Sequence, residues 1–155
     1  MTISSIDHYP GQLRQAFFGT HHLHWFTGLL TQVAGVTADE ASRSVFHGGS
    51  VAAHLSHVAQ CLKVVNETPS RPLSTVNWTE GWANARVSEE QWQVLLARVR
   101  VEVEELEQEV QSGAWLMHSD QDADTLWSQV LHAAYHAGAV AQILKYEQWI
   151  ASNAV

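Results

Sequence analysis

The chain has 155 residues, a formal net charge of −8 at pH 7 and a single cysteine, Cys61. This length predicts one domain, residues 1–155, with a hydrophobic core of its own. The negative charge argues against nucleic-acid and anionic-membrane partners, because both require a basic surface. One cysteine cannot form an internal disulfide, and we find neither a signal-peptide pattern nor an apolar run of membrane-spanning length. These features favour a cytoplasmic protein.

Apolar spacing predicts a first helix from Leu13 to about Ala34. This segment carries three histidines, which we expect to form a partly exposed polar cluster: His21, His22 and His24. The alternative is that His21 or His24 faces inward, because both continue the row of Phe17. Thr37 and Glu40 then have the spacing of a capping box, which predicts a short helix that ends before Gly48.

A second helix is predicted from Ser50, as its N-cap, to about Asn66. Its apolar residues follow the alternating spacing of a left-handed bundle: Val51, Leu55, Val58, Leu62 and Val65. One flank of this row carries His54, His57 and Cys61, and the opposite side is polar: Ser56, Gln60 and Lys63. The helical wheel directs His54 closer to the core than His57. We do not count Cys61 as a metal ligand, because cysteine is also a common small core residue.

Residues 67–87 break the helical pattern with two prolines, but they are too aromatic for a disordered linker. We expect this segment, with Trp78 and Trp82, to cross over one end of the bundle. Ser88 and Gln91 then form a second capping box, and a third helix is predicted to end at Gly113. Four of its apolar residues are expected in the core: Trp92, Val99, Val103 and Leu106. Its many glutamates favour a solvated face over a paired-carboxylate site.

A fourth helix is predicted from about Thr125 to Ile150. Three aspartates that precede it can cap it and oppose its dipole: Asp120, Asp122 and Asp124. Its small interior residues permit close packing and leave room for a cavity near His132 and His136. Four helices without a strand pattern predict an all-α four-helix bundle, with a tryptophan-containing crossover between helices two and three.

Two of the ten histidines, His132 and His136, lie four residues apart on this fourth helix. Four residues turn a helix by about 400°, so the two rings lie ~40° apart on one face. This spacing suits two ligands of one transition metal, and a third histidine from a facing helix would leave positions open for water or substrate. The other interpretation is a pair of buried, hydrogen-bonded core histidines, and spacing alone leaves both open.

Three stretches carry a family resemblance. Residues 50–58 (SVAAHLSHV) resemble the second-helix signature of the bacterial DinB superfamily, and residues 132–138 (HAAYHAG) resemble its fourth-helix signature. Residues 77–82 (NWTEGW), followed by residues 87–92 (VSEEQW), resemble the crossover of one subgroup. The resemblance implies that the third metal ligand is the histidine seven residues after the serine, His57. His54, which the wheel directs inward, remains as the alternative ligand or as a residue that orients one. The chain departs from the family pattern after Gly138, where Ala139 stands in place of a frequent glutamine.

The resemblance further implies a metal-dependent enzyme whose divalent ion, zinc or nickel, is held by His57, His132 and His136. The family includes YfiT-like metal hydrolases, thiol-dependent transferases and a maleylpyruvate isomerase. It therefore implies a transferase or hydrolase, with a low-molecular-weight thiol as one cosubstrate, without fixing the reaction. No residue stands out as a general base, and His54 is the nearest candidate. Because the relatives often pair, we expect a homodimer. The alternative function is a non-enzymatic bundle that binds metal or serves dimerisation or another interaction.

Overall fold

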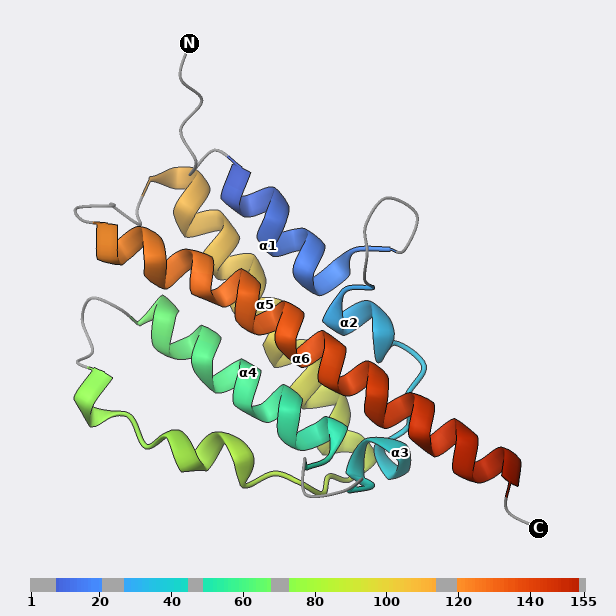
Figure 1. The fold of residues 1–155 in the computed structure, drawn as a ribbon. Helices are drawn as coiled ribbons and strands as arrows, with labels where there is room; N and C mark the ends of the chain where they lie inside the picture. The colour runs from blue at the N-terminus through green and yellow to red at the C-terminus, as the bar shows by residue number, and fades with distance from the viewer. Residues whose placement is uncertain (1–7, 21–26, 45–48, 68–72, 114–119, 154–155) are drawn as a thin grey trace.

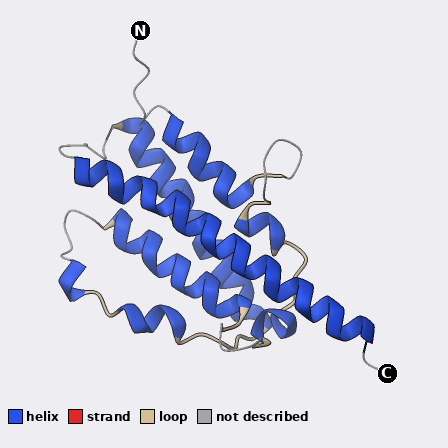
Figure 2. Ribbon diagram, viewed as in Figure 1, coloured by secondary structure: helices blue, strands red, loops and turns tan. Residues whose placement is uncertain are grey.

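The structure is a computed structural model that describes residues 8–20, 27–44, 49–67, 73–113 and 120–153. Within these ranges the chain forms six α-helices and two 3₁₀-helices, and no strand (Figure 1, Figure 2). The predicted all-α class is therefore confirmed for the described residues. No helix among them is both long and apolar enough to cross a membrane.

The predicted first helix is two separate helices, α1 (Tyr9–Phe18) and α2 (Leu29–Gln32), so the prediction of one helix was wrong. The chain leaves helical geometry at Gly19, where φ is −62° and ψ is 146°. Gly28 then passes close to it and donates its backbone N–H to Gly19 O at 2.9 Å. A Cβ on Gly28 would lie 2.6 Å from Gly19 N, so only glycine allows this crossing. The predicted polar cluster lies outside the described residues: His21, His22 and His24.

Three helices begin where their capping residues predicted: α3 (Ala38–Ser42), α4 (Val51–Asn66) and α5 (Glu89–Ser112). Thr37 and Ser88 each complete a capping box, and the Ser50 side chain accepts from the backbone N–H of Ala53. α5 ends at Gly113, whose φ of 75° is the left-handed conformation that glycine adopts most readily.

The last helix, α6 (Asp120–Asn153), begins about five residues earlier than predicted. Its three aspartates therefore lie inside its first turns rather than before it: Asp120, Asp122 and Asp124. The carboxylates of Asp122 and Asp124 are favourable there, because negative charge opposes the partial positive charge at a helix N-terminus.

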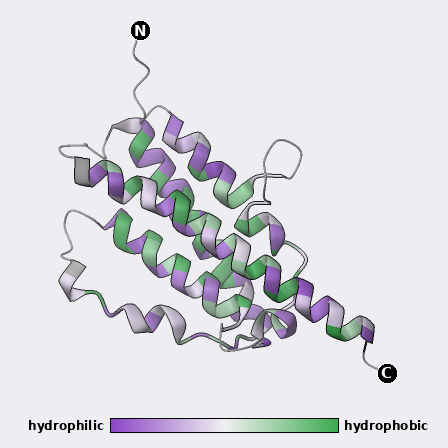
Figure 3. Cartoon of the chain, in the orientation of Figure 1, coloured by the Kyte–Doolittle hydropathy of each residue, from purple (hydrophilic) through white to green (hydrophobic). Residues whose placement is uncertain are grey.

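Buried side chains from all six described α-helices form one hydrophobic core. α4 contacts α5 and α6, and α1 contacts the same two helices. Apolar and polar residues alternate along these helices (Figure 3), and the apolar side faces inward. The four core residues predicted on α5 are all buried: Trp92, Val99, Val103 and Leu106. The apolar row of α4 packs into the same cluster: Val51, Leu55, Val58, Leu62 and Val65.

The segment between α4 and α5 contains two short helices, η3 (Leu73–Thr75) and η4 (Trp78–Trp82). η4 packs against α4, and the segment runs along the outer side of that helix (Figure 1). Polar side chains of α4 and of its N-cap, Ser50, hold it there. Ser50 Oγ donates to Ala85 O at 2.6 Å, and Gln60 Nε2 donates to Asn77 O at 2.7 Å. Asn84 Nδ2 in turn donates to Ser56 Oγ at 3.1 Å.

Candidate metal centre

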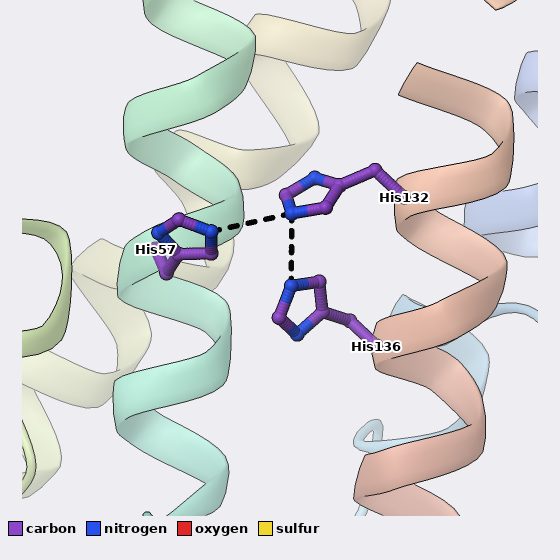
Figure 4. Close-up of side chains that lie close together, drawn as sticks. All are labelled: His57, His132 and His136. Carbon is purple, nitrogen blue, oxygen red and sulfur yellow. Dashed lines mark hydrogen bonds between the residues drawn. The ribbon is translucent and has the colours of Figure 1, made fainter. Parts of the chain in front are cut away.

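Three histidine rings from α4 and α6 meet between the two helices (Figure 4). His132 Nε2 lies 3.2 Å from His57 Nε2 and 2.9 Å from His136 Nε2. The three nearest ring nitrogens all lie within 4.8 Å of one another, close enough to hold one metal ion. The predicted meeting of the two histidine stretches is confirmed, and the binding of a metal stays a prediction.

The local sequence of α6 explains how the rings reach this position. His132 and His136 are one turn apart, so both project from the same side of the helix. Each histidine is followed by a small residue, Ala133 or Ala137. Both alanines are fully buried, which lets α6 pack closely against its neighbours. Across the interface, α4 presents His57 from a half-buried position.

His54 occupies a different place from the other three histidines. Only 5% of it is exposed, and its Nδ1 lies 2.8 Å from Nδ1 of His136. The helical wheel was right that His54 is the more buried of the two α4 histidines. The resemblance selected His57, whose Nε2 joins the three-nitrogen group. His57 therefore faces the three-nitrogen group, and His54 lies behind the His136 ring.

Burial keeps the cluster uncharged at neutral pH. Desolvation, aided by the neighbouring imidazoles, lowers the pKa of His136 to about 3 and of His132 to about 4. The pKa of His57 is lowered by the same two causes. Neutral imidazole is the form that binds a metal, so the rings need lose no proton at pH 7.

Cys61 lies at the edge of the cluster, with Sγ 3.7 Å from His57 Nε2. Burial raises the pKa of its thiol to about 11, so the thiol is protonated at pH 7. Among the described residues, the mutually close ligand atoms belong to the three histidines and do not include Sγ. That Cys61 is not a ligand stays a prediction.

Trp82 covers the cluster from the η4 side. Its ring stacks on the His57 ring, with centroids 4.4 Å apart and planes at 19°, and meets His54 edge-on at 5.3 Å. The side chain remains 40% exposed, so it forms a wall that solutes can reach. The sequence placed Trp82 in the crossover but gave no sign that it contacts the histidines.

A separate hollow of about 1050 Å³ lies beside α3 and the C-terminal part of α6. Its lining includes Arg43, Arg86 and Glu147, and none of the four clustered histidines borders it. The geometry therefore gives no reason to place the chemistry of the histidines in this hollow.

Comparison of the chain with protein-family models, with curated proteins and with solved structures found no match. The resemblance to the DinB superfamily thus rests on the two histidine signatures and the crossover motif.

Proposed function

We propose that the chain is a metal-dependent enzyme of the DinB type, in which His57, His132 and His136 hold one divalent ion. The observation that carries this proposal is the convergence of three neutral imidazoles from two packed helices. Imidazole ligands suit zinc and nickel. Three protein ligands leave a position open, which is typical of catalytic rather than structural zinc. On this proposal α1, α4, α5 and α6 form the four-helix bundle, with residues 67–87 as its tryptophan-containing crossover.

The contact between His54 and His136 supports an outer role for His54. A neutral imidazole that offers Nε2 to a metal carries its proton on Nδ1. His136 Nδ1–H then donates to His54 Nδ1, 2.8 Å away, and His54 keeps its own proton on Nε2. Such an outer hydrogen bond fixes the orientation and tautomer of a ligand. We therefore favour His54 as the partner of a ligand over His54 as a ligand.

The chemistry of the centre follows from its open position. A bound divalent ion supplies Lewis acidity, which lowers the pKa of a coordinated water or thiol toward neutrality. This favours a hydrolase, or a transferase that uses a low-molecular-weight thiol. Trp82 would supply an apolar wall for the organic part of such a substrate.

The alternative is a non-enzymatic bundle that acts through its surface. Two large apolar side chains of α6 near the centre favour it, since Leu131 is 71% and Tyr135 69% exposed. Turnover of thiol acceptors or simple esters, present with metal and absent after chelation, would support the enzyme. Metal binding without any such turnover would favour the alternative.

The ligand assignment predicts distinct metal contents for single variants, purified without a histidine tag and without added metal. The native chain should carry about one divalent ion, and His57→Ala and His136→Ala should lose it, because two imidazoles hold a transition metal far less tightly than three. His54→Ala should still bind, about 10- to 100-fold more weakly, as expected for an outer partner. His8→Ala, which changes an exposed histidine before α1, is the control.

Elemental analysis and a zinc titration measure both quantities. If His57→Ala keeps its metal while His54→Ala loses it, the assignment of the α4 ligand is wrong. If the native chain shows no micromolar affinity for zinc, nickel, manganese or iron, the non-enzymatic alternative replaces the proposal.

A further inference from the structure

Two buried polar atoms beside the centre lack hydrogen-bond partners within the described ranges of the chain: His57 Nδ1 and Gln60 Oε1. Both border the same spot. A Cβ on Gly81 would lie 3.2 Å from His57 Nδ1 and 2.4 Å from Gln60 Oε1. His57 and Gln60 are also three residues apart on α4, so their side chains are neighbours on the helix surface. A buried polar atom without a partner is costly, and one of these atoms can donate where the other accepts.

The far end of the Gln60 amide fixes which way its oxygen points. Gln60 Nε2 donates to the backbone carbonyl of Asn77 at 2.7 Å. Turning the amide over would set Oε1 against this carbonyl oxygen, and two acceptors cannot bond to each other. The oxygen therefore stays on the side toward His57. An acceptor there matches the His57 tautomer that carries its proton on Nδ1.

We propose that Gln60 is a positioning residue of the metal centre, whose Oε1 accepts a hydrogen bond from Nδ1–H of His57. This bond leaves the lone pair of His57 Nε2 directed at His132 and His136. A small adjustment of the two side chains closes it, because both atoms already border one spot. The effect on metal affinity rests on the proposed function, whereas the tautomer of His57 does not.

The contact between Gln60 and His57 needs a fixed partner for the Gln60 amide nitrogen and space for the two side chains. The crossover segment supplies both. The Asn77 side chain caps η4 by accepting from Thr79 N, which fixes the turn that presents the Asn77 carbonyl. Gly81, at the end of the same turn, leaves room for the two atoms because it has no Cβ. Asn77 and Gly81, which bind no metal themselves, thus determine that His57 offers Nε2 to the metal.

The test combines nitrogen NMR of the His57 ring in the metal-free protein with a zinc titration. The native protein should show His57 protonated on Nδ1. Gln60→Leu, which removes the acceptor, should shift His57 toward the Nε2–H tautomer and weaken zinc binding about 10- to 100-fold. Gln108→Leu, the same change at an exposed glutamine of α5, should alter neither.

Two results overturn the inference. One is an Nε2–H tautomer of His57 in the native protein, which needs no variant and so decides the question even if Gln60→Leu fails to fold. The other is a Gln60→Leu protein with native tautomer and native zinc affinity. If the tautomer depends on Gln60 but the native chain binds no zinc, the positioning of His57 is supported and the proposed function fails instead.

Discussion

At the scale of single residues, the four clustered histidines differ in which ring nitrogen takes part in the contacts between them. His57, His132 and His136 bring Nε2 together, whereas His54 contacts the opposite nitrogen of His136. Three charged rings at such distances would repel one another, and burial avoids this by keeping the pKa values of His57, His132 and His136 low. These three rings are therefore neutral at pH 7, and neutral imidazoles are suited to binding a cation.

The Cys61 thiol should take no part in metal binding. Its pKa of about 11 keeps it protonated, and ionising it beside three neutral imidazoles would require metal coordination to offset its burial. Cys61→Ser should therefore leave zinc affinity within about twofold of native, since no ligand is lost. A cobalt-loaded native protein should lack the thiolate charge-transfer band. A band that disappears in Cys61→Ser would show that sulfur is a ligand after all.

The histidines of this cluster were predicted from the sequence, but their surroundings were not. The spacing of His132 and His136 predicts a shared face, the resemblance selected His57, and the wheel gave the depth of His54. Gln60 was placed only on the polar side of α4. Its partner is a backbone carbonyl 17 residues away, and backbone atoms leave no mark in a sequence. The contact of Trp82 with His57 likewise depends on how η4 docks, which local patterns do not determine.

At the scale of elements, caps were predicted well and the glycine crossing was not. A capping box involves residues three apart, so it can be read locally, and Thr37, Ser50 and Ser88 start their helices as expected. The break after α1 depends on Gly19 meeting Gly28 nine residues later. A glycine inside an apolar helical pattern is usually tolerated, which is why the pattern predicted a continuous helix.

Two glycine substitutions, one where η4 docks on α4 and one inside α6, should have opposite effects on stability. Gly81→Ala should destabilise the protein by roughly 1–3 kcal/mol, because the new methyl group overpacks the interface. Its Cβ would meet His57 Cα at 3.1 Å. Gly138→Ala should instead stabilise it by about 0.5–1 kcal/mol, because the position lies inside α6 and a Cβ there meets nothing within 4 Å.

Urea unfolding with unchanged m-values measures both effects. The Gly138→Ala variant also serves as the control, because it adds the same methyl group in open space. A Gly81→Ala protein as stable as the native one would mean that η4 does not pack on α4 as closely as described.

At the scale of the whole molecule, α6 leaves large apolar side chains uncovered on the single chain. Leu131, Tyr135, Trp149 and Ile150 are each at least 45% exposed. The expected homodimer would cover part of this surface. Light scattering at micromolar concentration should give twice the mass of the chain, and Leu131→Glu should lower it. Val101→Glu, on an exposed position of α5, is the control. A monomeric mass for the native chain would contradict the prediction.

The metal-free protein should fold without its ion, because the helices share an extensive apolar core that a zinc finger lacks. Its stability should nevertheless fall in mild acid. The unfolded histidines take up protons below their ordinary pKa of 6.5, whereas folded His132 and His136 resist protonation down to about 4 and 3. Between these limits the unfolded state binds more protons, so the free energy of unfolding decreases as the pH falls. Above about pH 6.5 these groups do not change the free energy of unfolding with pH.

Urea unfolding of the chelator-treated protein between about pH 7 and pH 5 measures this decline. Burial raises the pKa of Glu102 and Glu147, which adds stability on acidification and opposes the trend, so the histidine share needs a matched comparison. His136→Asn removes the histidine whose pKa is lowered most, and its stability should decline less steeply. On the proposed function zinc binds the folded, neutral rings, so it should still stabilise the native chain at about pH 5. If the free energy of unfolding declined equally with pH in the two proteins, His136 would titrate alike in the folded and unfolded states. That result would contradict the prediction.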